Sequence, residues 1–132
     1  MKSDKKFHCL AAACVAAAGL AMTPAHAAEI RFGFAAPLTG PQSHYGEDMQ
    51  NGLLLALEEA NKQGIKIGGE VAKFVLVSKD DQADPRVAVQ VAQQLVDEGV
   101  DGILGHFNSG TTIPASRVYH DAGLPQIATA TS

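Results

Sequence analysis

The segment VDGILGHFNSGTT, residues 100–112, decides the fold of this chain. Its apolar run from Val100 to Leu104 has the length and composition of a buried strand. The run stops at Gly105, and a group of hydroxyl-bearing residues then opens a helix that we expect from about Thr112 to Ala122. A helix start carries unpaired backbone N–H groups and a partial positive charge. The junction therefore suits a carboxylate or a phosphate.

The rest of the chain repeats this alternation of strand and helix. Short runs rich in apolar and β-branched residues alternate with longer segments whose apolar residues recur every three or four positions. Asp84-Pro85 is typical of a helix start, because aspartate caps the first amides and proline is tolerated in the first turn. The strands are expected at residues 30–36, around 74–77 with an end at 80–81, at 100–104 and at 124–128, and the helices at about 46–63, 85–99 and 112–122.

This order predicts an α/β fold, with a parallel sheet and flanking helices. We find no hairpin signal between the expected strands, so each connection should be a right-handed crossover. In such a sheet every strand-to-helix loop leaves the same edge, where open α/β sheets bind their ligands. The loops brought together there would be residues 37–45, 80–84, 105–111 and the segment after 128.

Residues 1–27 are interpreted as a secretory signal peptide. Lysines near the start precede an Ala-rich apolar run over 10–22, and Ala25-His26-Ala27 has the small residues of a cleavage site. The run is too short and too weakly apolar to span a bilayer. A buried N-terminal helix is the alternative, but no amphipathic pattern supports it. The folded part is therefore expected at 28–132.

The composition of residues 28–132 limits the function classes. Both cysteines, Cys9 and Cys14, lie in the predicted signal peptide, so the folded part cannot form disulfides. Cys14 follows small residues, which leaves lipidation as an alternative. The sequence has 10 basic and 14 acidic residues. Three of the basic residues and one of the acidic residues lie in the predicted signal peptide, so residues 28–132 have seven basic and thirteen acidic residues. This acidic balance argues against nucleic acid or an anionic membrane as partner.

The glycine spacing of residues 105–112 resembles a phosphate-binding loop without its lysine. Thr111 stands where that loop needs the lysine, which argues against a nucleotide. A serine hydrolase is another alternative, with Ser109 as nucleophile and His106 as the nearest base, but no acidic residue in the same loop would orient the histidine. We expect His106 to be a polar residue that finishes the strand. The sequence assigns no catalytic residue and no cofactor.

Neither the histidines nor the acidic residues form a pattern of metal ligands. The histidines beyond residue 27 are scattered along the chain. Asp80, Asp81 and Asp84 lack the alternating oxygen donors and the closing glutamate of a calcium loop. We expect Asp84 to cap a helix and the other two to lie in a solvated turn. No metal site is predicted.

Three segments carry a family resemblance: IRFGFAAPLTGPQSHYG (30–46), KDDQADPRVAVQVAQQLV (79–96) and GILGHFNSGTTIPASRVYHDAGLPQIATATS (102–132). Together they resemble the amino-terminal lobe of the periplasmic leucine/isoleucine/valine-binding proteins of ABC importers. The resemblance covers residues 29–132 and implies part of a type I periplasmic binding protein, truncated before its hinge and second lobe. It implies a periplasmic, non-enzymatic protein, monomeric at full length, that delivers a branched-chain amino acid to an inner-membrane ABC permease.

The resemblance also implies a ligand site. Ser109 would hold the α-carboxylate of the ligand through its hydroxyl and backbone N–H. The carbonyl of Ala130 would accept from the α-ammonium, and Ser132, where the family usually has threonine, would contact both charged groups. The pocket for the ligand side chain would be lined or adjoined by Tyr45, Phe107 and Thr131.

Two positions depart from the family pattern. Members often join two cysteines across the loops that follow the second and third strands, and here those positions are Ala83 and Asn108. Asn108 puts a polar group beside the pocket, which keeps open another ligand, such as an amide, urea or an aromatic acid. The residues also suit a zwitterion independently of the resemblance. Ser109 and Thr111 offer donors for its carboxylate, and the loop after the fourth expected strand offers acceptors for its ammonium.

Overall fold

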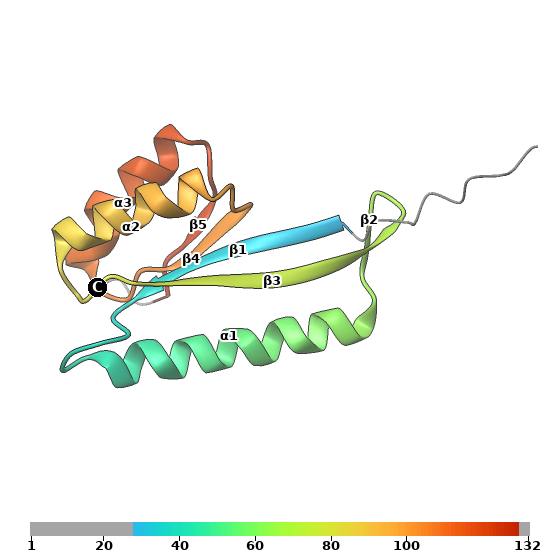
Figure 1. Ribbon diagram of the computed structural model, residues 1–132, viewed down its shortest axis with the longest axis horizontal. Coiled ribbons are helices and arrows are strands. Elements are labelled where there is room, and N and C mark those ends of the chain that lie inside the picture. Colours follow the sequence, from blue (N-terminus) through green and yellow to red (C-terminus); the bar gives the residue numbers. More distant parts are fainter. Residues whose placement is uncertain (1–27, 130–132) are drawn as a thin grey trace, which may run out of the picture.

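The computed structural model describes residues 28–129 and shows an α/β fold (Figure 1). The predicted signal peptide lies outside the described residues. The elements in chain order are β1 (Ala28–Ala36), α1 (Ser43–Gln63), β2 (Lys66–Ile67), β3 (Glu70–Asp80), α2 (Pro85–Asp97), β4 (Gly102–Gly105), α3 (Ser109–Asp121) and β5 (Gln126–Ile127).

The described strands form one mostly parallel sheet in the order β2-β3-β1-β4-β5. β1 pairs in parallel with β3 and β4, and β4 pairs in parallel with β5. Figure 1 shows α1 along one face of the sheet and α2 and α3 on the other. The predicted fold class, a parallel sheet with flanking helices, is confirmed.

The structure adds one short hairpin that the four expected strands did not include. β2 pairs antiparallel with the start of β3, with Lys66 opposite Val71 and Ile67 opposite Glu70. The turn between them is Gly68-Gly69, whose φ angles of 62° and 90° favour glycine. β2 is only 2 residues long and both residues are exposed, so it leaves no alternating pattern in the sequence.

Two helices begin earlier than predicted. α1 starts at Ser43 rather than about Gly46, and α3 starts at Ser109 rather than Thr112. In α3 the hydroxyls of Thr111 and Thr112 both donate to the carbonyl of Asn108, at 2.8 and 2.9 Å. The backbone N–H groups of Thr111 and Thr112 donate to the same carbonyl at 3.1 and 2.9 Å, so helical bonding already begins at Asn108 and the helix includes Ser109.

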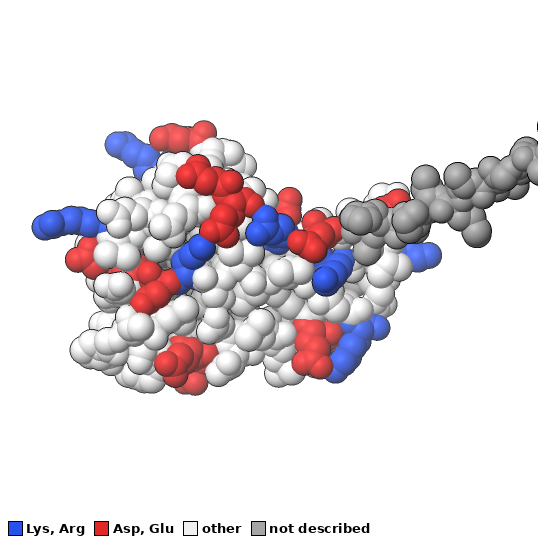
Figure 2. All heavy atoms as spheres, in the orientation of Figure 1, with Lys and Arg blue, Asp and Glu red and all other residues white. Residues whose placement is uncertain are grey.

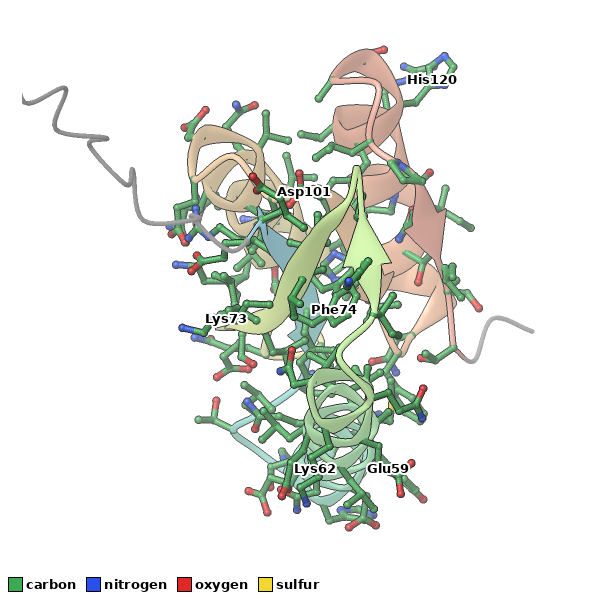
Figure 3. The ribbon with its side chains drawn as sticks, turned by 90° about the vertical axis from the view of Figure 1, so that its right-hand side faces the viewer. Glu59, Lys62, Lys73, Phe74, Asp101 and His120 are labelled. Atoms are coloured by element: carbon green, nitrogen blue, oxygen red, sulfur yellow. The ribbon has the colours of Figure 1, made fainter. Side chains whose placement is uncertain are left out.

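The hydrophobic core lies between the sheet and the layer of α2 and α3. The apolar stripe predicted on α2 is fully buried there: Ala88, Val91, Ala92 and Leu95. On the other face α1 buries only Gly46 completely, and its Leu54 and Leu55 are 48% and 60% exposed. Glu59 and Lys62 lie on the side of α1 away from the sheet (Figure 3). Within residues 28–129, no helix has the length and apolar character required to cross a membrane.

The order of the strands creates a switch point beside β1. The chain runs from β1 to β3 on one side and then crosses through α2 to β4 on the other side of β1. α1 follows β1 and α3 follows β4, and these two helices cover opposite faces of the sheet (Figure 1). Ligands of open α/β sheets bind in the crevice at such a point. The loops at residues 37–42 and 106–108 stand on its two sides.

Candidate ligand site

Two contacts join the segments on either side of this switch point, one from the start of α1 and one from the loop before it. The rings of Tyr45 and Phe107 stack with centroids 5.0 Å apart and planes 18° apart. Beside them the side-chain amide of Asn108 donates to Gln42 Oε1 at 2.8 Å, across 66 residues of sequence. Tyr45 remains 48% exposed, so the stacked pair forms an apolar wall open to solvent. The structure thus brings two of the residues singled out in the sequence into contact.

Ser109 is the first residue of α3 and is partly buried. The preceding Asn108 has extended backbone angles, but its side chain makes no capping bond because its amide reaches across to Gln42 instead. The positive end of α3 therefore lies beside the aromatic wall without a cap from this residue. Ser109 follows Phe107 by two residues at the start of this helix.

The structure contradicts the expectation that Thr111 offers its hydroxyl to a ligand. Thr111 is fully buried, and its Oγ1 donates to the Asn108 carbonyl of its own helix start. Thr112 is similarly engaged, with its hydroxyl donating to the carbonyls of His106 and Asn108 at 3.3 and 2.9 Å. These hydroxyls shape the turn rather than line the crevice. Sequence alone gives no sign of which way a hydroxyl near a helix start will point.

The segment after β5 reaches the same edge of the sheet. The hydroxyl of Thr129 lies 3.8 Å from the sulfur of Met49 on α1. The next three residues of the predicted site, Ala130, Thr131 and Ser132, lie outside the described residues.

Asn108 carries an unsatisfied acceptor. Its Oδ1 is buried and has no hydrogen-bond partner, and no other buried side-chain nitrogen or oxygen in residues 28–129 is in this position. A buried polar atom without a partner costs roughly 1–3 kcal/mol. Such an atom beside an open aromatic wall is a candidate contact for a donor supplied from outside the described residues.

Asp80 ties the first loop to the second. Its carboxylate accepts from the backbone N–H of Leu38 at 2.8 Å, from the Thr39 hydroxyl at 2.5 Å and from the N–H of Gln82 at 2.9 Å. Burial raises the pKa of Asp80, but these hydrogen bonds outweigh it and leave the pKa below its ordinary value. Asp80 stays partly exposed, as expected, but it ends β3 and its carboxylate also holds the first loop.

Asp84 behaves as predicted. It is the N-cap of α2, and its side chain accepts from the N–H groups of Arg86 and Val87 at 2.7 and 3.1 Å. The hydrogen bonds from Val87 and Arg86 lower the pKa of Asp84. The Asp84-Pro85 pair thus sets the start of α2 locally, as the sequence pattern indicates.

The largest correction concerns His106 and Asp81. Both are fully buried, and His106 Nδ1 lies 2.6 Å from Asp81 Oδ2. The other ring nitrogen lies 3.0 Å from the hydroxyl of Tyr119, which is 1% exposed. Asp81 is therefore not in a solvated turn, and His106 does not simply end a strand. With both nitrogens engaged and no access to solvent, His106 cannot take a proton from Ser109, which removes the hydrolase alternative.

Sequence reasoning missed this cluster because its members are far apart in the chain. Asp81 and His106 are 25 residues apart, and His106 and Tyr119 are 13 apart. A usable signal was present, since Asp81 and His106 each follow a strand whose end lies at the same edge of a parallel sheet.

Charged side chains are spread over the surface. On the face shown in Figure 2, acidic and basic side chains are interspersed without a broad basic patch. The pairs include Lys62 with Glu58 at 2.6 Å, and Lys79 with Glu98. In the described part of the chain, no three His, Cys, Asp or Glu side chains gather closely enough to hold a metal ion.

Comparisons with known proteins agree with this fold. Residues 29–132 match the periplasmic binding protein family. Leu/Ile/Val-binding protein homolog 2 of Brucella abortus (strain 2308) is 42% identical over 105 residues, which are 80% of this chain and 28% of that protein. The structure of the branched-chain amino acid transporter substrate binding protein LivJ from Streptococcus pneumoniae, in complex with isoleucine, superposes with a TM-score of 0.72 and 30% identity, covering 79% of this chain and 29% of LivJ.

A second solved structure extends the range of ligands. The solute binding protein from Rhodopseudomonas palustris BisB5, in complex with 3,4-dihydroxy benzoic acid, gives a TM-score of 0.68 and 27% identity over 79% of this chain and 28% of that one. The chain thus spans little more than a quarter of the length of these relatives. The resemblance seen in the sequence is confirmed: the chain belongs to the periplasmic binding protein family.

Proposed function

We propose that the full-length protein is a periplasmic solute-binding protein that captures leucine, isoleucine or valine and delivers it to the permease of an ABC importer. The observation that carries this proposal is the stacked pair of Tyr45 and Phe107 beside the start of α3. An apolar wall next to a helix start is what an amino acid with an aliphatic side chain and a carboxylate requires. The predicted signal peptide over residues 1–27 supports the periplasmic location.

The ligand contacts in this proposal are those that the family resemblance implies. Ser109 holds the α-carboxylate, the carbonyl of Ala130 accepts from the α-ammonium, and Ser132 contacts both. Charge-assisted hydrogen bonds contribute roughly 1.5–3 kcal/mol each, so a few of them together with the apolar wall suffice for binding of about micromolar strength. The ligand side chain lies against Tyr45, Phe107 and Thr131.

The test is calorimetry on the full-length protein. We expect Ser109→Ala to weaken leucine binding at least about tenfold, the loss of one charge-assisted bond. Ser116→Ala is the matched control, because this serine lies on the same helix and its hydroxyl donates to the Ile113 carbonyl at 2.8 Å. An unchanged affinity in Ser109→Ala contradicts the assigned contact, and an absence of heat with all three amino acids contradicts the ligand class.

The proposal includes a second lobe that closes over the ligand and signals to the permease. Residues 28–132 alone should therefore bind leucine poorly, because they span only 28% of the length of the Brucella relative. Leucine binding by residues 28–132 as tight as that of the full-length, monomeric protein would refute a site shared between two lobes.

Asn108 favours a second candidate, the same fold with a ligand that carries a hydrogen-bond donor. Its unpartnered Oδ1 could accept from an amide, from urea or from the hydroxyls of an aromatic acid such as the one bound by the Rhodopseudomonas protein. A thermal-shift screen separates the candidates, since a ligand at 100 times its Kd adds about 2.7 kcal/mol of stability. A larger shift with one of these compounds than with leucine, lost in Asn108→Ala, would replace the branched-chain assignment.

A further inference from the structure

A row of three buried, hydrogen-bonded polar side chains passes through the turn between β4 and α3. The proposed ligand contacts do not use it. It runs from Asp81, after β3, through the ring of His106 to the hydroxyl of Tyr119 on α3, with distances of 2.6 and 3.0 Å. Asp81 and His106 are fully buried and Tyr119 is 1% exposed. His106 is also the residue directly before Phe107, so its position fixes where the aromatic wall begins.

The hydrogen bonds among Asp81, His106 and Tyr119 are all satisfied when the imidazole of His106 carries its proton on Nδ1. Asp81 Oδ1 already accepts from the N–H of Ala83 at 2.9 Å, which leaves Oδ2 for the Nδ1–H of His106. The hydroxyl of Tyr119 then donates to Nε2. Burial and the negative charge of Asp81 raise the pKa of Tyr119 far above its usual range, so this hydroxyl keeps its proton. The arrangement selects one tautomer of His106.

Hydrogen bonds also hold the backbone of this turn, as they hold the imidazole ring of His106. The His106 carbonyl accepts from the Thr112 hydroxyl, and the Asn108 carbonyl accepts from the hydroxyls of Thr111 and Thr112. Asp81 is itself fixed to the central strand, because its N–H donates to the Ala36 carbonyl at 3.1 Å. The path from His106 to Ser109 is therefore defined at its start by side chains from two other elements.

Stability alone does not account for this cluster. Replacing a buried polar network by well-packed apolar side chains is often neutral or stabilising, whereas directional bonds fix a unique geometry that apolar packing does not. The inaccessible ring of His106 cannot touch a ligand, but it orients the residues that can.

We propose that the Asp81–His106–Tyr119 chain is a positioning device that holds residues 107–109 in their ligand-binding geometry. The proposal rests on the proposed function of that site. His106 and Asp81 act through Phe107 and Ser109, and neither contacts the ligand.

The first experiment compares two variants of the full-length protein by titration with leucine. Asp81→Asn keeps the shape of the side chain but can donate as well as accept, so it no longer selects the tautomer of His106. We expect the Kd for leucine to rise about fivefold or more, because small displacements of binding groups are costly. Leu95→Ala is the control: this core residue of α2 packs under Gly33, and its loss lowers stability with the Kd for leucine unchanged within about twofold.

A second readout reports on the ring itself. ¹⁵N NMR of the His106 imidazole should show the Nδ1–H tautomer in the parent protein and in Leu95→Ala, and a mixture in Asp81→Asn. Should Asp81→Asn fail to fold, Tyr119→Phe carries the same test, because phenylalanine fills the same volume without the donor to Nε2.

The outcomes separate this inference from the proposed function. If the parent protein does not bind leucine, the proposed function fails, and amide hydrogen exchange of residues 107–112 then decides the inference: exchange should be faster in Asp81→Asn and not in Leu95→Ala. An unchanged Kd together with unchanged exchange in Asp81→Asn overturns the positioning role. An equal loss of affinity in Leu95→Ala overturns it as well.

Discussion

The two halves of the β4–α3 turn differ sharply. His106 points into the protein, is fully buried and has partners at both ring nitrogens. Phe107 and Asn108 are only partly buried; Phe107 stacks on the half-exposed Tyr45, and Asn108 has an acceptor without a partner. Neighbouring residues thus differ in role: the polar atoms of His106 have hydrogen-bond partners and support the turn, while Asn108, at the candidate site, has an acceptor without one. The difference teaches that hydrogen-bond satisfaction, rather than residue type, separates support from function in this turn.

The largest effect should come from breaking the backbone that both halves share. Gly105 has a φ of 115°, and a Cβ placed there would lie 2.1 Å from the Ala35 carbonyl oxygen. Gly105→Ala should therefore lower the free energy of unfolding by about 3 kcal/mol or more, from backbone strain and overlap combined. Urea unfolding measures this. Gly52→Ala on exposed α1, where a Cβ meets nothing within 4 Å, should instead raise stability by up to about 1 kcal/mol.

The scaffold half is tested by removing one hydroxyl. Tyr119→Phe leaves the buried Nε2 of His106 without its donor, which should cost roughly 1–3 kcal/mol in thermal or urea unfolding. Tyr45→Phe removes an equivalent hydroxyl from a side chain that is 48% exposed, and it should change stability by less than about 0.5 kcal/mol. An equal loss of stability in the two variants would contradict the distinction between the supporting residues and the candidate site.

The site half is tested by removing its aromatic wall. Tyr45→Ala should weaken leucine binding about three- to tenfold, the value of one aromatic contact, with little change in stability because the side chain is half exposed. Calorimetry and thermal unfolding on the same samples measure both quantities. Leu55→Ala, at a position of α1 that is 60% exposed, should change neither. A loss of stability in Tyr45→Ala without loss of affinity would make the wall part of the scaffold.

The smallest effect should appear at Asp80, which supports the first loop of the site. Because its pKa is lowered in the folded protein, its ionised form stabilises the fold above its unfolded pKa, and this contribution is lost as the pH falls through the lowered value. Asp80→Asn should be modestly less stable than the parent at pH 7, and the difference should shrink below about pH 4. Unfolding measured at several pH values tests this, with the exposed Asp121→Asn as control. A difference that stays constant with pH would contradict the assigned hydrogen bonds.

Much of the fold was predictable because it rests on local patterns. The buried stripe of α2 follows from apolar spacing, and the start of α2 follows from Asp84-Pro85. The hairpin of β2 was missed because two exposed residues carry no periodic signal. In the site, the contact between Tyr45 and Phe107 is compatible with the sequence prediction, while the inward turn of the Thr111 hydroxyl contradicts it.

By itself, the sequence determined the alternation of strand and helix, the shared edge of the loops and the family of this protein, because helix periodicity, caps and strand composition act over a few neighbouring residues. Only the tertiary structure decided which polar groups became scaffold. The bond between Asn108 and Gln42 and the bond between His106 and Asp81 join residues 66 and 25 positions apart. Their direction depends on which loops the sheet order brings together, and the order of strands around β1 is set by packing across the whole domain rather than by any one segment.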